Sequence, residues 1–132
     1  MSFVFSAPVR FAHCDPAGIA YFPRLFELFD AAVEDWTAQV IGVSRAAMHG
    51  ELRRGMPTVD LHASFSAPCR LGERLDIAVA IEGVGGSSVD LAATASVAGA
   101  PRFAVRCKQV LMDLDTARAA PWPAAWRDRL AA

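Results

Sequence analysis

The chain has 132 residues, of which 54% are hydrophobic and 20% charged, and its formal net charge is −1. This composition excludes an intrinsically disordered chain, and the length predicts a single folded domain over residues 1–132. Since no run of Lys and Arg is present, we expect binding neither to nucleic acid nor to an anionic membrane surface.

The three cysteines, Cys14, Cys69 and Cys107, are far apart and form no C-x-x-C pair. This pattern predicts neither a disulfide framework nor a zinc cluster, and lone thiols are typical of a reducing compartment. The first ten residues lack a positive segment followed by a long apolar stretch, and no apolar run is long enough to span a membrane. We therefore expect a cytoplasmic protein.

The first half of the chain predicts a strand, a turn and a long helix. Residues 3–12 are apolar and extended in character, and a turn follows them. From Pro23 onward apolar residues recur at helical spacing, and Gly42 follows the last of them, so we expect a helix over 23–41. Its apolar face is broad, which predicts burial on more than one side. A short helix over 44–53 is expected to begin at Ser44 as its N-cap.

The second half alternates with a period of two. In the segment 57–68, one face carries Val59, Leu61, Ala63, Phe65 and Ala67, and the other carries Thr58, Asp60, His62, Ser64 and Ser66. Further strands are expected over 73–82, 87–98 and 102–113, with short glycine-containing connections that favour antiparallel pairing. A terminal helix is expected within 121–130, with Trp122 and Trp126 packed on the domain. These elements predict an α+β architecture of the hotdog kind, a curled antiparallel sheet of about five strands wrapped around one long central helix.

The segment FAHCDPAGIAYFP at 11–23 contains the most distinctive motif. It resembles the 4-hydroxybenzoyl-CoA thioesterase family of hotdog enzymes, through C-D-P-A-G-I at 14–19 and the aromatic pair before Pro23. G-x-P-x-V at 55–59 and A-S-F at 63–65 extend the resemblance over about the first half of the chain. The resemblance implies hydrolysis of an acyl-CoA thioester by a homo-oligomer, a dimer or tetramer with active sites at subunit interfaces. It implies no metal and no organic cofactor.

The resemblance also assigns roles to residues of this motif. Asp15 matches the catalytic carboxylate, which acts as a nucleophile or as a general base on water. The backbone N–H of Phe22 matches the donor that polarises the thioester carbonyl, as suits the unsatisfied amides of a helix start. From the residues alone, Asp15 also suits a plain turn, and both roles can hold together.

Two neighbouring residues are candidates for substrate binding. Tyr21 either lines an acyl pocket or packs in the core. His13 either positions substrate or makes a structural hydrogen bond. Adjacent residues rarely converge on one ion, so His13, Cys14 and Asp15 do not predict a metal site.

Two departures from the family pattern bear on the substrate. A related branch acting on short-chain acyl groups has histidine in place of Phe22, so this chain favours an aromatic or medium-size acyl group. The stretch that carries phosphate-binding cations in the family reads EGVGGSSV at 82–89, without any cation. The remaining candidates for binding the CoA phosphates are Arg70, Arg74, Arg102, Arg106 and backbone donors. The alternatives are a thioesterase acting on acyl carrier protein and a hotdog protein that binds an acyl thioester without hydrolysing it.

Overall fold

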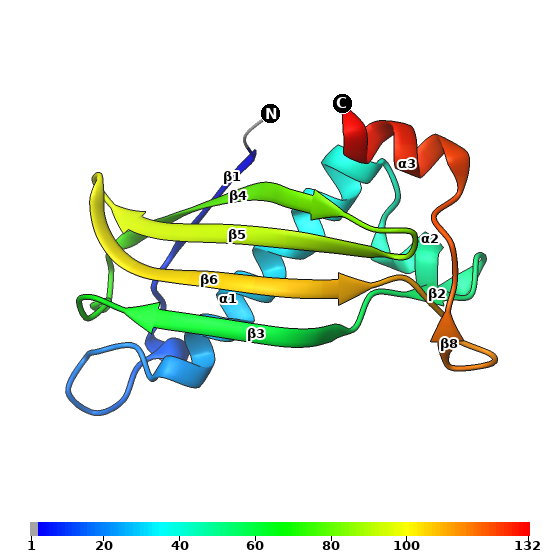
Figure 1. The fold of residues 1–132 in the computed structure, drawn as a ribbon. Coiled ribbons are helices and arrows are strands. Elements are labelled where there is room, and N and C mark those ends of the chain that lie inside the picture. The colour runs from blue at the N-terminus through cyan, green and yellow to red at the C-terminus, as the bar shows by residue number, and fades with distance from the viewer. Residues whose placement is uncertain (1–2) are drawn as a thin grey trace.

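A long helix lies across one face of a five-stranded antiparallel sheet (Figure 1). The computed structural model describes residues 3–132, so residues 1–2 of the expected domain lie outside the described range. The strand order is β1-β4-β5-β6-β3. The sheet strands are β1 (Phe3–Pro8), β3 (Thr58–Phe65), β4 (Arg74–Val84), β5 (Ser88–Val97) and β6 (Ala100–Val110). This arrangement confirms the predicted α+β hotdog architecture.

The central helix α1 spans Phe22–Trp36 and continues as one π-helical turn, Thr37–Ile41. The Thr37 hydroxyl donates to the carbonyl oxygen of Val33 at 2.7 Å, and Gly42 ends the helix at φ +89°, a conformation that favours glycine. Its buried side chains are Leu25, Leu28, Phe29, Ala32, Val33 and Trp36. The breadth of this face follows from the curvature of the sheet, which wraps around the helix.

The strands bury one face against α1. The inward side chains of β4, β5 and β6 are at most 6% exposed; they are Leu75, Ile77, Val79, Val89, Leu91, Ala93, Ala95, Phe103, Val105 and Cys107. Burying each large apolar side chain contributes about 1.5–3 kcal/mol, which makes this layer the main source of stability. The first strand is shorter than predicted, since β1 ends at Pro8 and a 3-10 turn spans Phe11–His13.

Strand β3 lies at the edge of the sheet and is paired only with β6. The pairing shifts between Thr58 and Asp60, so Thr58 lies opposite the buried Gln109. The simple alternation predicted for this strand is therefore wrong at its start, because a β-bulge adds one residue. The apolar face is also open, with Val59, Leu61 and Phe65 between 40% and 56% exposed.

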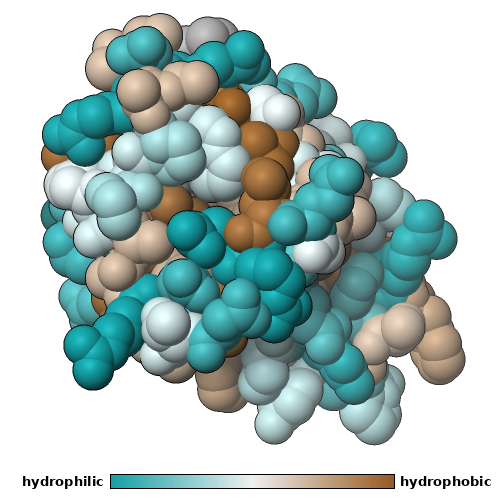
Figure 2. Space-filling model, turned by 90° about the vertical axis from the view of Figure 1, so that its right-hand side faces the viewer, coloured by the Kyte–Doolittle hydropathy of each residue, from teal (hydrophilic) through white to brown (hydrophobic). Residues whose placement is uncertain are grey.

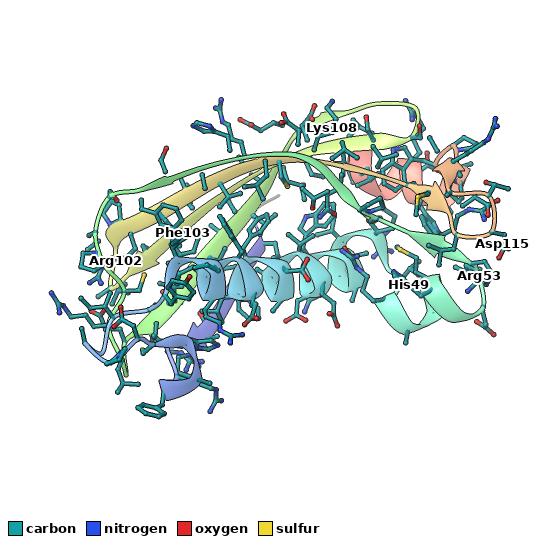
Figure 3. All side chains as sticks on the ribbon, turned by 90° about the horizontal axis from the view of Figure 1, so that it is seen from below. His49, Arg53, Arg102, Phe103, Lys108 and Asp115 are labelled. Atoms are coloured by element: carbon teal, nitrogen blue, oxygen red, sulfur yellow. The ribbon has the colours of Figure 1, made fainter. Side chains whose placement is uncertain are left out.

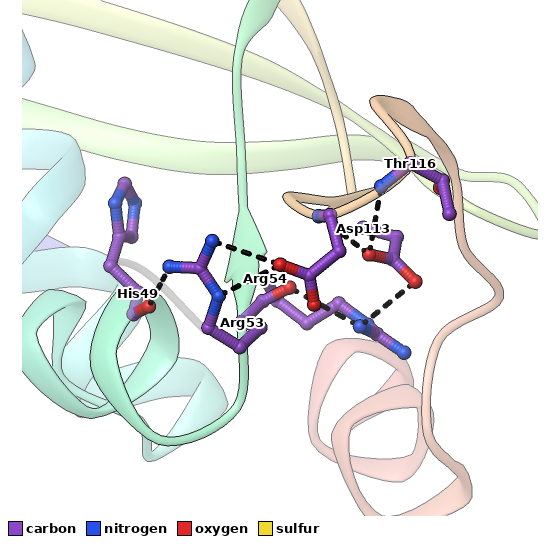
Figure 4. A network of polar contacts seen from close by, with 6 residues as sticks. His49, Arg53, Arg54, Asp113 and Thr116 are labelled. Carbon is purple, nitrogen blue, oxygen red and sulfur yellow. Dashed lines mark hydrogen bonds and ion pairs between the residues drawn. The ribbon is translucent and has the colours of Figure 1, made fainter.

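A second, three-stranded sheet closes the end of the molecule where α1 terminates, and the sequence did not predict it. It contains β2 (Arg54–Gly55), β7 (Met112–Asp113) and β8 (Arg118–Ala119). Figure 4 shows the polar contacts that join it to α2 (Arg45–Gly50). Arg53 donates to Asp115 Oδ1 and to the His49 carbonyl, and Arg54 pairs with Asp113 at 3.5 Å.

Both remaining helices were predicted from the sequence. Ser44 caps α2 by accepting from the Ala47 amide at 3.1 Å. The terminal helix α3 spans Ala124–Ala131, and the indole of Trp122 donates to the Ser88 carbonyl at 3.1 Å. The end of the molecule that carries these helices shows many hydrophilic side chains, with the most hydrophobic ones mainly toward the middle of the view (Figure 2). Within residues 3–132, no helix combines the length and apolarity needed to cross a membrane.

Candidate active site

The segment that carries the distinctive motif folds into a small hairpin-like loop before α1. The Asp15 amide donates to the Ile19 carbonyl at 3.0 Å, and the Gly18 amide donates to the Asp15 carbonyl at 3.0 Å. Gly18 has φ +76°, which a residue with a side chain rarely adopts. The Tyr21 amide donates to the His13 carbonyl at 2.9 Å. The loop therefore holds Asp15 and the start of α1 in a fixed relation.

The Asp15 side chain stabilises this turn with one of its two carboxylate oxygens. Oδ1 accepts from the Ala17 amide at 2.9 Å and from the Ile19 amide at 3.4 Å. Oδ2 has no hydrogen-bond partner within residues 3–132, and the residue is exposed. One oxygen thus fixes the carboxylate and the other is open to a substrate or water.

The start of α1 leaves an amide open next to this loop. Tyr21 is the N-cap, without a side-chain cap, and Pro23 has no N–H. The Arg24 amide donates to the Tyr21 carbonyl at 2.8 Å, whereas the Phe22 amide has no acceptor in the described part of the chain. Because the peptide dipoles of the helix give this end a partial positive charge, the Phe22 N–H can stabilise a developing oxyanion.

Aromatic rings extend from this helix start along the inner side of the sheet. Phe22 contacts Phe65 edge to face, with ring centroids 6.1 Å apart, and Phe65 contacts Phe103 at 5.8 Å. Phe22 is 54% and Phe65 46% exposed. A cavity of about 360 Å³ lies beside them, lined by Ala20, Phe22, Leu25, Phe65, Ser66, Ala67, Pro68 and Cys69. Apolar lining with an open amide at its edge suits an acyl group.

An ion pair fixes the wall of this cavity formed by residues 66–69. Arg102 binds both carboxylate oxygens of Glu73, at 2.7 and 3.0 Å, and donates to the Pro68 carbonyl at 2.6 Å. The hydrogen bonds from Arg102 and from the Arg70 amide hold the pKa of the Glu73 carboxyl below its usual value. Figure 3 places Arg102 and Phe103 at one end of the molecule and the network of His49, Arg53 and Asp115 at the other.

A second hollow of about 450 Å³ lies beside the loop. It is lined by Phe11, Cys14, Asp15, Pro16, Gly18 and Leu71. Asp15 and Phe22 therefore line two different hollows of this single chain.

The other predicted site residues have structural contacts. Nδ1 of His13 accepts from the Arg10 amide at 2.9 Å, as expected of a structural histidine. Tyr21 is 55% exposed and packs on Phe22, with centroids 5.7 Å apart, outside the residues that line the cavity. Burial raises the pKa of the Cys69 thiol, and that of Cys107 to about 11, which makes both poor nucleophiles. No group of three or more His, Cys, Asp or Glu side chains within residues 3–132 is arranged to hold a metal ion.

Sequence reasoning missed most of the cavity wall. The alternation predicts only a strand face for Phe65, and nothing in the sequence connects Cys69 to the site. The A-S-F motif at 63–65 was the available signal, because it places an aromatic ring at the end of an edge strand. Of the arginines considered for phosphate, Arg102 is bound by Glu73 and Arg106 by Glu82.

Solved structures with the same fold include several thioesterases. Slr0204, a 1,4-dihydroxy-2-naphthoyl-CoA thioesterase from Synechocystis, matches with a TM-score of 0.88 at 22% identity, over 99% of this chain and 96% of that one. The gentisyl-coenzyme A thioesterase BH1999 matches at 0.85 and 22%, over 95% and 99%. SAV2348 from Staphylococcus aureus, solved in complex with CoA, matches at 0.91 and 15%, over 99% and 82%. Identities this low establish a shared fold, and no curated protein matches this chain in sequence.

A comparison with protein families covers nearly the whole chain. The family model described as thioesterase-like superfamily matches residues 9–130, a range that includes the Asp15 loop, α1 and four of the five strands of the main sheet. The narrower resemblance to the 4-hydroxybenzoyl-CoA thioesterases remains a prediction. At the level of the superfamily the assignment is direct: the chain belongs to the thioesterase-like superfamily.

Proposed function

We propose that this protein is an acyl-CoA thioesterase that hydrolyses the thioester of an aromatic or medium-size acyl group to the free acid and CoA. The observation that carries the proposal is the open amide of Phe22 at the edge of an apolar cavity, seven residues after a carboxylate with one free oxygen. An acyl group in the cavity would bring its carbonyl to the helix start. The thioesterases and the CoA complex among the structural neighbours agree with this assignment.

Two routes are compatible with the free oxygen of Asp15. As a general base, Asp15 takes a proton from water, and the hydroxyl oxygen bonds to the carbonyl carbon. The Phe22 N–H donates to the resulting oxyanion, the C–S bond breaks, and the thiolate takes up the proton that Asp15 received. As a nucleophile, Asp15 itself bonds to the carbonyl carbon and expels the thiolate, and water then cleaves the mixed anhydride. Because the pKa of a thiol is about 8.5, the thiolate can leave in either route without protonation by a strong acid.

The aromatic lining supports an aromatic acyl group as the preferred substrate. The ring of an aromatic acyl group would pack edge to face against Phe22 and Phe65. Such contacts between rings contribute about 0.5–1.5 kcal/mol beyond the burial of apolar area. Two of the structural neighbours are described as thioesterases for gentisyl-CoA and for 1,4-dihydroxy-2-naphthoyl-CoA. Both substrates carry aromatic acyl groups of the kind that this cavity would accept.

The test of this proposal is the release of free thiol from a panel of acyl-CoA esters. The panel contains benzoyl, hydroxybenzoyl, hydroxynaphthoyl, hexanoyl and acetyl esters, with the same acyl groups on acyl carrier protein. We expect the highest kcat/KM for an aromatic acyl-CoA and the lowest for acetyl-CoA. Faster thiol release from acyl carrier protein than from acyl-CoA would identify acyl carrier protein as the carrier of the substrate. Binding of acyl-CoA without any thiol release would instead identify a non-catalytic acyl-thioester-binding protein.

The open edge of the sheet supports a homodimer. Strand β3 is eight residues long, with unpaired backbone on one side and large apolar side chains exposed. Such edges are normally covered, and a second copy pairing antiparallel about a two-fold axis covers both edges at once. The start of the second copy's β3 would then lie beside the Phe65 end of this one. We infer that the cavity beside Phe65 is completed at this interface, and two such dimers would make a tetramer.

A charge placed in the middle of β3 is expected to separate the dimer. In Leu61→Glu, two carboxylates would meet near the two-fold axis without partners, so sedimentation at micromolar concentration should show monomers with native circular dichroism. Thr94→Glu, on the outer face of β5, is the control and should sediment like the wild type. A monomeric wild type, or a dimeric Leu61→Glu, would refute this interface.

A further inference from the structure

Most cationic side chains of this protein are already bound by partners in the fold. Arg24, Arg53, Arg54, Arg102, Arg106 and Lys108 pair with carboxylates. Arg45, Arg127 and Arg129 donate to a hydroxyl or to backbone carbonyls. Within residues 3–132, this leaves four exposed arginines whose guanidinium groups have no ion pair and no hydrogen bond: Arg10, Arg70, Arg74 and Arg118.

Three of these four arginines come from one corner of the fold, beside the Asp15 loop. Arg70 pairs through its backbone with Ile19 of that loop. Arg10 follows Val9, whose carbonyl accepts from the Gly72 amide at 2.9 Å. Arg74 lies opposite Pro8 in the pairing of β1 with β4. Arg118 lies in β8, in the small sheet at the other end of α1.

The carboxylates of this corner leave the three cations in excess. Glu73 is neutralised by the two hydrogen bonds from Arg102. Asp76 accepts a hydrogen bond from the Ser6 hydroxyl, and Asp15 accepts from the amides of its own turn. This corner therefore contains three arginines and two carboxylates that form no ion pair within residues 3–132.

The hollow that contains Asp15 connects these arginines to the candidate site. Phe11 and Leu71 form its apolar wall, and Arg10 and Arg70 immediately precede them in the chain. An apolar wall suits the pantetheine arm of a thioester. Two long arginine side chains that begin beside this wall suit phosphate, which each guanidinium group can bind through two parallel N–H groups. Ala20, which follows the same loop, lines the acyl cavity.

We propose that Arg10 and Arg70 bind the phosphate groups of CoA at the rim of the Asp15 hollow, in place of the cations that the 82–89 stretch lacks. This assignment rests on the proposed function, because it takes the ligand to be the thiol carrier of the substrate. A phosphopantetheine arm on acyl carrier protein offers one phosphate of the same chemistry, so the test must separate the two sources.

The experiment compares one aromatic acyl group on three carriers: CoA, 4′-phosphopantetheine and pantetheine without phosphate. For Arg10→Gln/Arg70→Gln, we expect the ratio of kcat/KM for acyl-CoA to that for acyl-pantetheine to fall by about tenfold or more, as the loss of charge-assisted contacts predicts. Arg118→Gln removes an equally free arginine at the other end and should leave the ratio unchanged. If the double variant loses as much kcat/KM for acyl-phosphopantetheine as for acyl-CoA, the arginines bind the phosphate next to the pantetheine. A smaller loss of kcat/KM for acyl-phosphopantetheine than for acyl-CoA would assign the arginines to the nucleotide phosphates.

Binding of free CoA, measured by calorimetry, separates failure of this site from failure of the proposed function. Weaker CoA binding by the double variant than by the wild type and Arg118→Gln supports the site even if no thioester is cleaved. A wild type that binds no CoA, or that cleaves acyl-CoA and acyl-pantetheine equally well, would overturn it. An equal loss of kcat/KM on all three carriers would also overturn the proposed phosphate site. It would show that the two arginines support the loop and do not contact phosphate.

Discussion

Asp15→Asn is expected to lower kcat for thioester hydrolysis by about 10³-fold, within the range for loss of a general base or carboxylate nucleophile. The asparagine side chain keeps a carbonyl oxygen that can accept from the Ala17 and Ile19 amides, as Asp15 Oδ1 does. The turn should therefore persist, and the thermal midpoint should stay close to that of the wild type. Thiol release and a thermal melt measured on the same preparation would check both expectations.

Two further variants separate the charge of Asp15 from its structural contact. Asp15→Ala removes the turn hydrogen bonds as well, so it should lose stability in addition to activity. Asp60→Asn removes an exposed carboxylate on the outer face of β3 and should leave kcat unchanged. Activity of Asp15→Asn above a tenth of the wild type would show that this carboxylate only shapes the turn. In a single turnover in oxygen-labelled water, label in the Asp15 carboxylate would identify the nucleophilic route.

The sequence was most informative where one local pattern determined the structure. The helical spacing after Pro23 and the glycine at 42 predicted α1 closely, because helix ends depend on local backbone preferences. The strands were also predicted, since β4, β5 and β6 each bury a single face. The small sheet was missed because its strands are two residues long, too short to show a period.

The candidate site could be predicted only in part, because its walls come from distant segments. Asp15 and Phe22 belong to one motif, and the resemblance to the family predicts a role for both, which stays a prediction. The position of Cys69 beside Phe22 depends instead on the pairing of the loop with the β3–β4 connection, where the Ala20 amide donates to the Cys69 carbonyl at 2.8 Å. Which arginines stay free could not be predicted either, since ion pairs such as Arg102 with Glu73 form across the fold. Pairing of residues far apart in the sequence leaves no local pattern.

The edge strand β3 shows that an apolar pattern in the sequence does not reveal which surface the apolar face contacts. Val59, Leu61 and Phe65 alternate as a buried strand would, yet the single chain leaves them exposed. Alternation indicates that a face avoids water, and it does not indicate which surface covers that face. We propose a second copy of the chain as the surface that covers β3, and on that proposal the pattern of this strand reports on the assembly.

Phe22→Pro is expected to lower kcat by about 10²–10³-fold relative to Phe22→Ala, the loss measured when one oxyanion donor is removed. Both variants lose the aromatic ring, and only proline lacks the backbone N–H. The position tolerates proline, because it is the first residue of α1 and Tyr21 before it has φ −69° and ψ 124°, which a following proline favours. The comparison of these two variants therefore tests the contribution of the backbone N–H at residue 22.

The outcome depends on the helix start being intact in both variants, which matching circular dichroism and thermal midpoints would establish. Phe22→Ala should itself raise KM for aromatic acyl-CoA more than for hexanoyl-CoA, because the ring forms one wall of the cavity. If the proline and alanine variants hydrolyse acyl-CoA at the same rate, the Phe22 amide is not the oxyanion donor. Within residues 3–132, that amide is the donor at the start of α1 that has no acceptor. Such a result would therefore remove the oxyanion donor from the proposed mechanism and leave only the proposed role of Asp15.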